Sequence, residues 1–197
     1  MSLSTLAAPA RFESIVKKSR FLAMATAVDD VEQAAAFLAA VRETGANHNC
    51  WAFRVGDSYR SSDDGEPAGT AGRPILAAID GQRCDRVVVV VARWFGGIKL
   101  GAGGLARAYG GAASECLRIA AKTPLVELAQ ATIACEFGHV GAIHQLIAQF
   151  GAGKRGEHFS DDGLRIAIEL PRDRLAPLQN ALRDATRGQA RLAEDPE

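Results

Sequence analysis

The residues of this sequence best suited to chemistry lie in and around a glycine-rich loop at residues 96–104. The loop reads GGIKLGAGG and holds five glycines and one lysine, Lys99, and Arg107 follows it. Glycine has no side chain to bury and loses the most backbone entropy on folding. Such a loop therefore adopts backbone conformations closed to other residues, or lets another group approach the backbone closely. Backbone N–H groups at a helix N-terminus, next to basic side chains, would hold a phosphate there.

Two aromatic residues precede the loop and suggest nucleic acid as the source of that phosphate. Trp94 and Phe95 could stack on bases. The residues that we expect to form a nucleic-acid or anion-binding face are Arg73, Arg93, Trp94, Lys99, Gly101, Gly103, Gly104 and Arg107. The alternative is structural: the glycines pack a helix against a sheet, and the aromatic rings belong to the core. Since neighbours on an extended segment face opposite ways, one ring is expected inside and one outside.

The loop resembles two nucleotide-binding fingerprints, but its sequence context fits neither of them. Gly101, Gly103 and Ala106 satisfy the pattern GxGxxA before a helix. A dinucleotide fold needs a tight turn after the strand, whereas residues 93–100 separate the preceding strand from Gly101. A Walker loop is excluded because Lys99 is followed by leucine and not by serine or threonine. We therefore expect no cofactor.

An acidic segment, SSDDGEPAGTAGRP at residues 61–74, holds Asp63, Asp64 and Glu66. Carboxylates suit a hard cation such as Mg²⁺ or Ca²⁺, so these residues form a possible acidic or metal loop. They can equally be turn residues that bind local backbone groups, or partners of Arg73 or Lys99. No confident metal site follows.

His48 and Cys50 are two residues apart on an expected strand and therefore face the same side. A Cys/His nucleophile pair is conceivable, but no third partner is indicated and a half-buried strand explains both residues. We predict no catalytic residue.

Composition narrows the class of protein. The 197 residues are 48% hydrophobic and carry a formal net charge of zero, which argues against a general basic coat for nucleic acid. Residues 1–123 hold 15 Lys and Arg against 12 Asp and Glu, while residues 124–197 hold 8 against 11, so an anion-binding face belongs in the first part. The four cysteines form no CxxC pair. Without a signal peptide or an apolar run of about 18 residues, we expect a cytoplasmic protein without membrane contact.

The elements that must position these residues follow from the hydrophobic pattern. In the first part we predict strands at 12–16, 21–28, 48–55 and 86–92, and helices at 31–41, 75–79 and 105–122. Asp30 and Gln33 form a capping box before the first helix. Gly110 and Gly111 weaken the last helix, which suggests that it packs closely on the sheet.

The break at Thr123 and Pro124 marks a domain boundary. Beyond it we predict strand 125–137, helix 139–150, strands 153–159 and 163–170, helix 173–187 and strand 188–193, which is the ferredoxin-like order β-α-β-β-α-β. The chain is thus expected to be an α+β protein with a flexible tail at 1–10, one domain at 11–123 and another at 124–197.

Three motifs resemble the Impact/YigZ family, also called uncharacterised protein family 0029. They are HNCWAF at residues 48–53, SDDGEPAGTAGRPIL at 62–76 and the segment from the valine run through the glycine loop at 87–112. The resemblance implies an N-terminal domain with the ribosomal protein S5 domain 2-like fold, followed by a ferredoxin-like domain similar to domain V of elongation factor G. Eukaryotic relatives regulate translation through a protein partner.

The leading hypothesis is a non-enzymatic regulator associated with translation, which binds RNA, the ribosome or a translation-related protein through the basic glycine-rich loop. The alternative is a phosphate- or nucleotide-binding enzyme that uses this loop together with Asp63, Asp64 and Glu66. Neither hypothesis specifies an oligomeric state.

Overall fold

The computed structural model describes residues 3–161 and 163–195, and the chain divides into two compact units, residues 1–125 (unit 1) and 126–197 (unit 2). The elements of unit 1 are β1 (Ser4–Leu6), β2 (Ala10–Val16), β3 (Ser19–Ala27), α1 (Val31–Ala40), β4 (His48–Val55), β5 (Ser58–Ser62), α2 (Gly72–Gly81), β6 (Val87–Trp94), α3 (Ala102–Ile119) and β7 (Lys122–Pro124).

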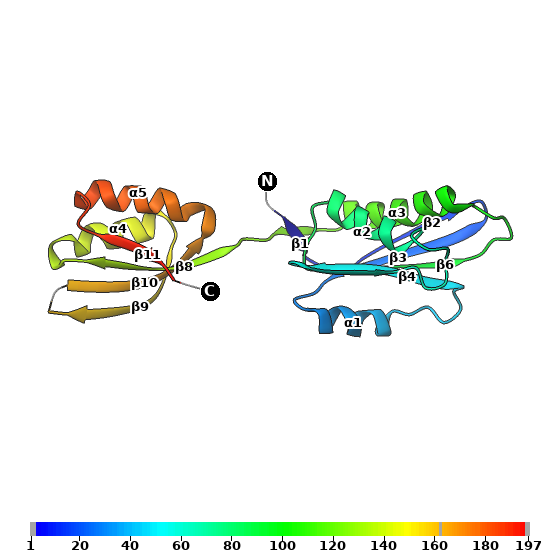
Figure 1. The fold of residues 1–197 in the computed structure, drawn as a ribbon, viewed down its shortest axis with the longest axis horizontal. Helices are drawn as coiled ribbons and strands as arrows, with labels where there is room; N and C mark the ends of the chain where they lie inside the picture. The colour runs from blue at the N-terminus through cyan, green and yellow to red at the C-terminus, as the bar shows by residue number, and fades with distance from the viewer. Residues whose placement is uncertain (1–2, 162, 196–197) are drawn as a thin grey trace. The chain divides into compact units, whose positions relative to one another are not determined.

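The main sheet of unit 1 has the order β2-β3-β6-β4-β5, with every neighbouring pair antiparallel. Helices α2 and α3 cover one face and α1 covers the other (Figure 1). The central strand β6 is therefore buried on both sides, and residues 87–91 are at most 2% exposed. A continuous β-branched run is typical of such a strand, and the prediction from the five valines is confirmed.

Helix α1 begins with the predicted capping box. The Asp30 carboxylate accepts a hydrogen bond from the Gln33 amide N–H at 2.7 Å. The Gln33 side chain reaches back, but it accepts from the N–H of Asp29, at 3.0 Å, and not from that of Asp30.

The N-terminal residues differ from the prediction of a flexible tail over residues 1–10. Residues 4–6 form β1, which pairs antiparallel with β7, and the Leu6 side chain is 4% exposed in the core of unit 1. This segment is fixed in position because Leu6 is buried and because β1 pairs with β7, a strand far along the chain. Residues 1–2 lie outside the described residues.

Helix α3 begins at Ala102, three residues before the predicted start. The early start places Gly103 and Gly104, the last two glycines of the loop, in the first helical turn. Gly110 is close to α2 and not to the sheet: a Cβ there would lie 3.4 Å from the Cβ of Pro74. The expected close packing is thus between two helices, whereas Gly111 faces open space.

Unit 2 has the predicted element order. Its elements are β8 (Leu128–Cys135), α4 (Val140–Gln149), β9 (Gly153–Ser160), β10 (Gly163–Pro171), α5 (Leu175–Thr186) and β11 (Arg191–Glu194), with single 3₁₀ turns before the two helices. The sheet order is β11-β8-β10-β9, and all neighbours are antiparallel. Both helices pack on one face (Figure 1), where Ile133, Ile143 and Leu178 are fully buried. Pro177 lies in the first turn of α5, where a missing N–H does no harm.

Among the described residues, no helix has both the length and the apolar character that crossing a membrane requires.

Candidate anion-binding site

A cavity of about 500 Å³ opens in unit 1 where α3 begins. Its lining comes from the start of β4, the acidic segment, the end of β6 and the glycine-rich loop: Asn47, His48, Glu66, Pro67, Arg93, Phe95, Lys99, Leu100, Gly101, Ala102 and Leu105. Small-molecule sites typically measure about 300–1,000 Å³, so this space suits one small ligand or one unit of a polymer.

The N-terminus of α3 supplies the donors of this cavity. Gly101 is the N-cap residue with φ of 72°, which favours glycine, and no side chain caps the helix. The first N–H groups of a helix have no intrahelical partner, and the helix dipole adds partial positive charge there. The exposed Lys99 lies on the same wall. This end of the cavity therefore attracts an anion.

The floor of the cavity is a buried ion pair between Glu66 and Arg93. The Arg93 Nη1 donates to the Glu66 Oε1 at 2.6 Å, and both side chains are more than nine-tenths buried. Tyr109 donates its hydroxyl proton to the same carboxylate oxygen at 2.7 Å. Burial raises the pKa of Tyr109, so this hydroxyl keeps its proton. Arg93 Nε is buried and has no hydrogen-bond partner among the described residues.

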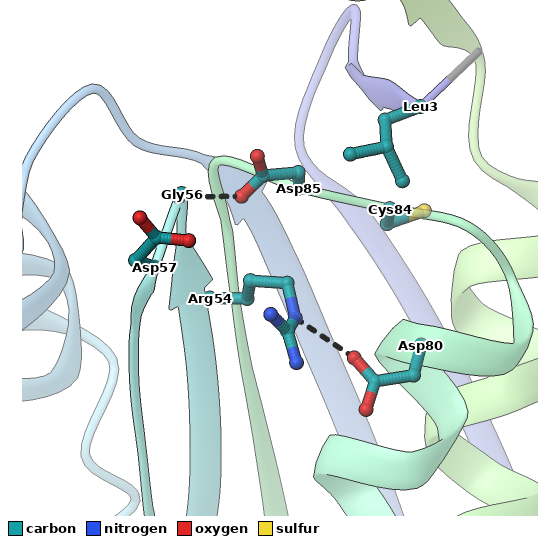
Figure 2. A pocket seen from close by; sticks show the side chains of 7 residues that line it. All are labelled: Leu3, Arg54, Gly56, Asp57, Asp80, Cys84 and Asp85. Atoms are coloured by element: carbon teal, nitrogen blue, oxygen red, sulfur yellow. Dashed lines mark hydrogen bonds and ion pairs between the residues drawn. The ribbon is translucent and has the colours of Figure 1, made fainter.

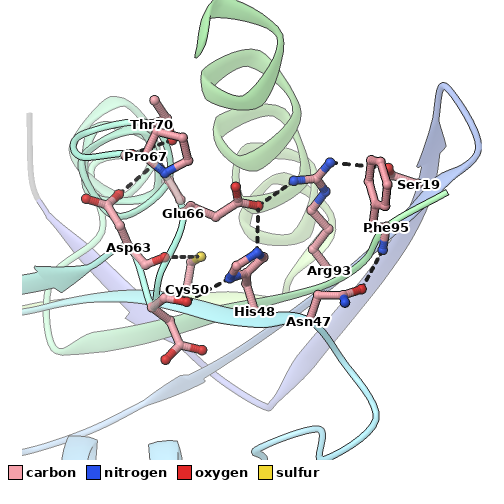
Figure 3. Close-up of polar contacts among 12 residues, drawn as sticks. Ser19, Asn47, His48, Cys50, Asp63, Glu66, Pro67, Thr70, Arg93 and Phe95 are labelled. Atoms are coloured by element: carbon pink, nitrogen blue, oxygen red, sulfur yellow. Dashed lines mark hydrogen bonds and ion pairs between the residues drawn. The ribbon is translucent and has the colours of Figure 1, made fainter. Parts of the chain in front are cut away.

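His48 joins the acidic segment to the cavity (Figure 3). Its Nδ1 lies 2.8 Å from the carbonyl oxygen of Asp64. A carbonyl only accepts, so Nδ1 carries the proton and Nε2 is the acceptor nitrogen of the neutral ring. The Nε2 atom lies 3.9 Å from Glu66 Oε1. The imidazole is thereby held in one tautomer with its other nitrogen toward the cavity.

Asp63 organises the acidic segment around the start of α2. Its carboxylate accepts from the N–H groups of Gly69, Ala71 and Gly72 at 2.8–2.9 Å. Burial alone would raise the pKa of Asp63, but these hydrogen bonds and the nearby Arg73 charge lower it below its ordinary value. The side chain is thus the anionic cap of a helix that has no cap of its own at Ala71.

The three carboxylates of the segment do not converge on a metal. Asp64 accepts from the N–H of Asn49 at 2.6 Å, and its other oxygen lies 3.7 Å from Arg42. Asp63 binds backbone amides and Glu66 binds Arg93. Across the described ranges, no group of three or more His, Cys, Asp or Glu side chains is placed to hold a metal ion. The sequence had suggested Arg73 or Lys99 as the partner of Glu66, but its partner in the structure is Arg93.

Cys50 lies beside His48 on one side of β4, as the alternation predicts, but it is not poised as a nucleophile. Its thiol is fully buried and donates to the carbonyl oxygen of Asp63 at 3.0 Å. Burial raises the pKa of Cys50 to about 12, so the thiolate is absent near neutral pH.

The structure brings some predicted site residues together and separates others. Lys99, Gly101 and Arg93 line the cavity, although Arg93 is only 5% exposed and its charge is paired. Gly103 follows in the first turn of α3, and a Cβ there would lie 3.6 Å from an Arg107 nitrogen. Arg107 and Gly104 line a separate hollow of about 210 Å³ with Lys17.

Trp94 and Arg73 lie elsewhere. The Arg20 guanidinium covers the Trp94 ring at 4.2 Å, on the opposite face of β6 from Arg93. Arg73 is exposed on α2, where its Cδ would lie 3.7 Å from a Cβ at Gly69. The expected single basic face is thus divided, because successive residues of a strand point to opposite sides.

Residues that the sequence did not place in the site are Asn47 and Tyr109, whereas Phe95 was expected to be able to stack on bases but was not included in the basic face. Phe95 is 48% exposed at the cavity wall. Asn47 accepts from the Phe95 N–H at 2.7 Å and fixes the backbone there. His48 and Cys50 are two residues apart and face the same side of β4, where both contact the acidic segment. This spacing is visible in the sequence, whereas no comparable pattern predicts the contact of Asn47 with Phe95.

A second cavity, of about 430 Å³, lies at the other end of β4 (Figure 2). Its charged groups bind one another: Arg54 Nε donates to Asp80 at 2.8 Å, and Asp85 accepts from the N–H groups of Gly56 and Arg86. These contacts stabilise a turn and the end of a helix, so the charged residues of this cavity have a structural role.

Comparisons with known proteins place the chain in a family. A family model described as the Impact N-terminal domain matches residues 17–117, and one described as a domain of unknown function, DUF1949, matches residues 133–189. The chain is 49% identical to an "IMPACT family member in pol 5'region" of Thermus thermophilus, over 88% of this chain and 97% of that one. It is 39% identical to "IMPACT family member YigZ" of Escherichia coli (strain K12), over 94% of each chain.

A crystal structure described only as that of a hypothetical protein is also similar. It has a TM-score of 0.65 and 36% sequence identity, covering 100% of this chain and 99% of the other. The family model, the curated relatives and this fold agree, and the chain belongs to the Impact family.

Proposed function

We propose that this protein is a non-enzymatic regulator associated with translation, and that the cavity at the start of α3 binds a phosphate group of RNA. The observation that carries the proposal is the uncapped N-terminus of α3, which opens onto a cavity beside Lys99. Glu66 and Arg93 neutralise each other, so Lys99 and the helix dipole leave a positive surplus.

The folds that the sequence suggests belong to the same proposal. The sheet order β11-β8-β10-β9, with helices on one face, supports a ferredoxin-like assignment for unit 2. An S5 domain 2-like assignment for unit 1 rests on the family resemblance. The resemblance of these folds to a translation factor supports RNA as the class of ligand.

The test is RNA binding by the full chain as a function of salt. Phosphate contacts release counterions, so affinity should fall steeply as salt rises. Lys99→Ala should weaken binding and reduce the salt slope by about one unit. Lys154→Ala is the matched control, since this exposed lysine of unit 2 is paired with Glu157 at 2.7 Å. Salt-independent binding, or equal effects of the two substitutions, would contradict the proposal.

A second function, phosphoester chemistry, is favoured by one observation. His48 is held in the tautomer whose Nε2 can accept a proton, in the cavity where the phosphate would lie. The Asp63 and Asp64 part of the earlier enzyme hypothesis gains no support, because both carboxylates bind backbone groups. Release of phosphate or cleavage of RNA by the protein, lost in His48→Ala, would favour this function over simple binding.

A further inference from the structure

The wall of the cavity next to the phosphate position carries an aromatic ring. Phe95 is 48% exposed and lines the same cavity as Lys99 and Gly101. The Arg93 guanidinium carbon lies 5.5 Å from the centre of the ring. An exposed phenylalanine beside an anion site offers an apolar π-face to a ligand that also carries negative charge.

The ring is held in place by its surroundings. Asn47 accepts from the Phe95 N–H at 2.7 Å (Figure 3). The side-chain oxygen of Asn47 is thereby identified, and its NH₂ group remains as a donor at the cavity wall. Arg93, which contacts the ring, is itself fixed by Glu66 and lies over the buried Phe21 ring at 5.6 Å. A pre-positioned ring loses little conformational entropy on binding.

A buried charged side chain also borders the cavity. Arg93 is 95% buried and lines the cavity, yet its Nε has no partner in the part of the chain that the structure describes. The Nε atom is itself closed to solvent, so its missing hydrogen bond is a cost of the buried ion pair and does not mark a position for a ligand oxygen. The helix terminus, Lys99 and Arg93 line the same space of about 500 Å³ as Phe95.

We infer that the ligand of this cavity is a single nucleotide unit, with its phosphate at the start of α3 and its base stacked on Phe95. This inference rests on the proposed function and names the ligand class of the same site. The unit can come from a free nucleoside monophosphate or from a phosphorylated end of single-stranded RNA, since both present the same phosphate and base. The stacking residue is Phe95 and not Trp94, whose ring Arg20 covers.

Calorimetry of the full chain with AMP, ribose 5-phosphate and inorganic phosphate tests the inference. Base stacking on an aromatic residue predicts that AMP binds about 5- to 150-fold more tightly than ribose 5-phosphate. Phe95→Ala should abolish this preference, by lowering the affinity for AMP toward that for ribose 5-phosphate. Phe159→Ala is the matched control, because Phe159 is 59% exposed in unit 2 and should leave all three affinities unchanged.

Two different failures can be told apart. Equal affinity for AMP and ribose 5-phosphate, or a preference that survives in Phe95→Ala, overturns the inference, while Lys99-dependent RNA binding would leave the proposed function standing. If none of the three ligands binds and Lys99→Ala leaves RNA binding unchanged, both the inference and the proposed function are overturned.

A short oligoadenylate with and without a 5′-phosphate distinguishes the two sources. If the 5′-phosphorylated oligoadenylate binds more tightly than both its unphosphorylated form and AMP, the ligand is the RNA end. If AMP binds more tightly than the phosphorylated oligoadenylate, the ligand is the free nucleotide.

Discussion

Glu66 and Arg93, which are 27 residues apart in the chain, form a hydrogen-bonded ion pair at 2.6 Å with both side chains buried. The pair connects the acidic segment to the end of β6, and Tyr109 of α3 donates a hydrogen bond to the same Glu66 oxygen. Two desolvated charges contribute modestly as a pair, but each is costly without the other. The geometry of the cavity therefore depends on both partners being present.

Glu66→Gln should lower the free energy of unfolding by about 3–5 kcal/mol, because it leaves a buried guanidinium without its counterion. Arg93→Met should cost a similar amount, and the double variant should cost less than the sum of the two. Urea denaturation of the three variants measures this coupling. Glu115→Gln breaks the exposed Glu115–Arg118 pair and is expected to change stability very little. Additive costs for Glu66→Gln and Arg93→Met would argue against a coupled pair.

Asp63→Asn should destabilise unit 1 at neutral pH, because an amide cannot accept three backbone hydrogen bonds as well as a carboxylate does; we expect about 1–3 kcal/mol. The pKa of Asp63 is lowered in the folded protein. Its contribution is therefore fully present above the unfolded pKa of about 3.9 and is lost as pH falls through the lower folded value.

The difference between wild type and Asp63→Asn in urea denaturation should accordingly shrink only below about pH 3.9. The exposed Asp57 offers a control, since Asp57→Asn should change the free energy of unfolding very little at neutral pH. A difference that already disappears near pH 6 would show that Asp63 is not the group responsible.

The sequence predicts the structure correctly where the physical cause is local. The valine run predicts a buried strand, and Asp30 with Gln33 predicts a helix start, because each depends on residues within one turn or one strand. The spatial arrangement of the predicted site residues depends on contacts that are distant in the sequence. Whether Arg93 is exposed depends on Glu66 and Tyr109, which only the folded chain brings to it. Strand alternation could have separated Arg93 from Trp94, but it does not say which side carries the cavity.

The four cysteines should be unreactive in the native protein. All four are buried, and burial raises their pKa values, to about 12 for Cys50 and about 11 for Cys116. The thiolate is the reactive form, so a disulfide-exchange reagent at pH 8 should label almost none of them. After denaturation in urea, all four should react. Rapid labelling of one thiol in the folded protein would contradict this prediction, because the thiol would have to be exposed to the reagent. Loss of that labelling in a Cys50→Ser variant would identify the thiol as Cys50.

Gly96→Ala and Gly111→Ala should have opposite effects on stability, although both replace a glycine by alanine. A Cβ at Gly96 would lie 2.0 Å from the backbone of Lys18, so the glycine loop or the β2–β3 turn would have to move. A Cβ at Gly111 meets nothing within 4 Å, and alanine there should stabilise α3 by up to about 1 kcal/mol. Thermal unfolding measures both changes. Because the glycine loop also carries Lys99 and Gly101, Gly96→Ala should weaken anion binding as well, whereas Gly111→Ala should leave it intact. Equal stability of the two variants would mean that the close approach of Lys18 does not hold the loop in place.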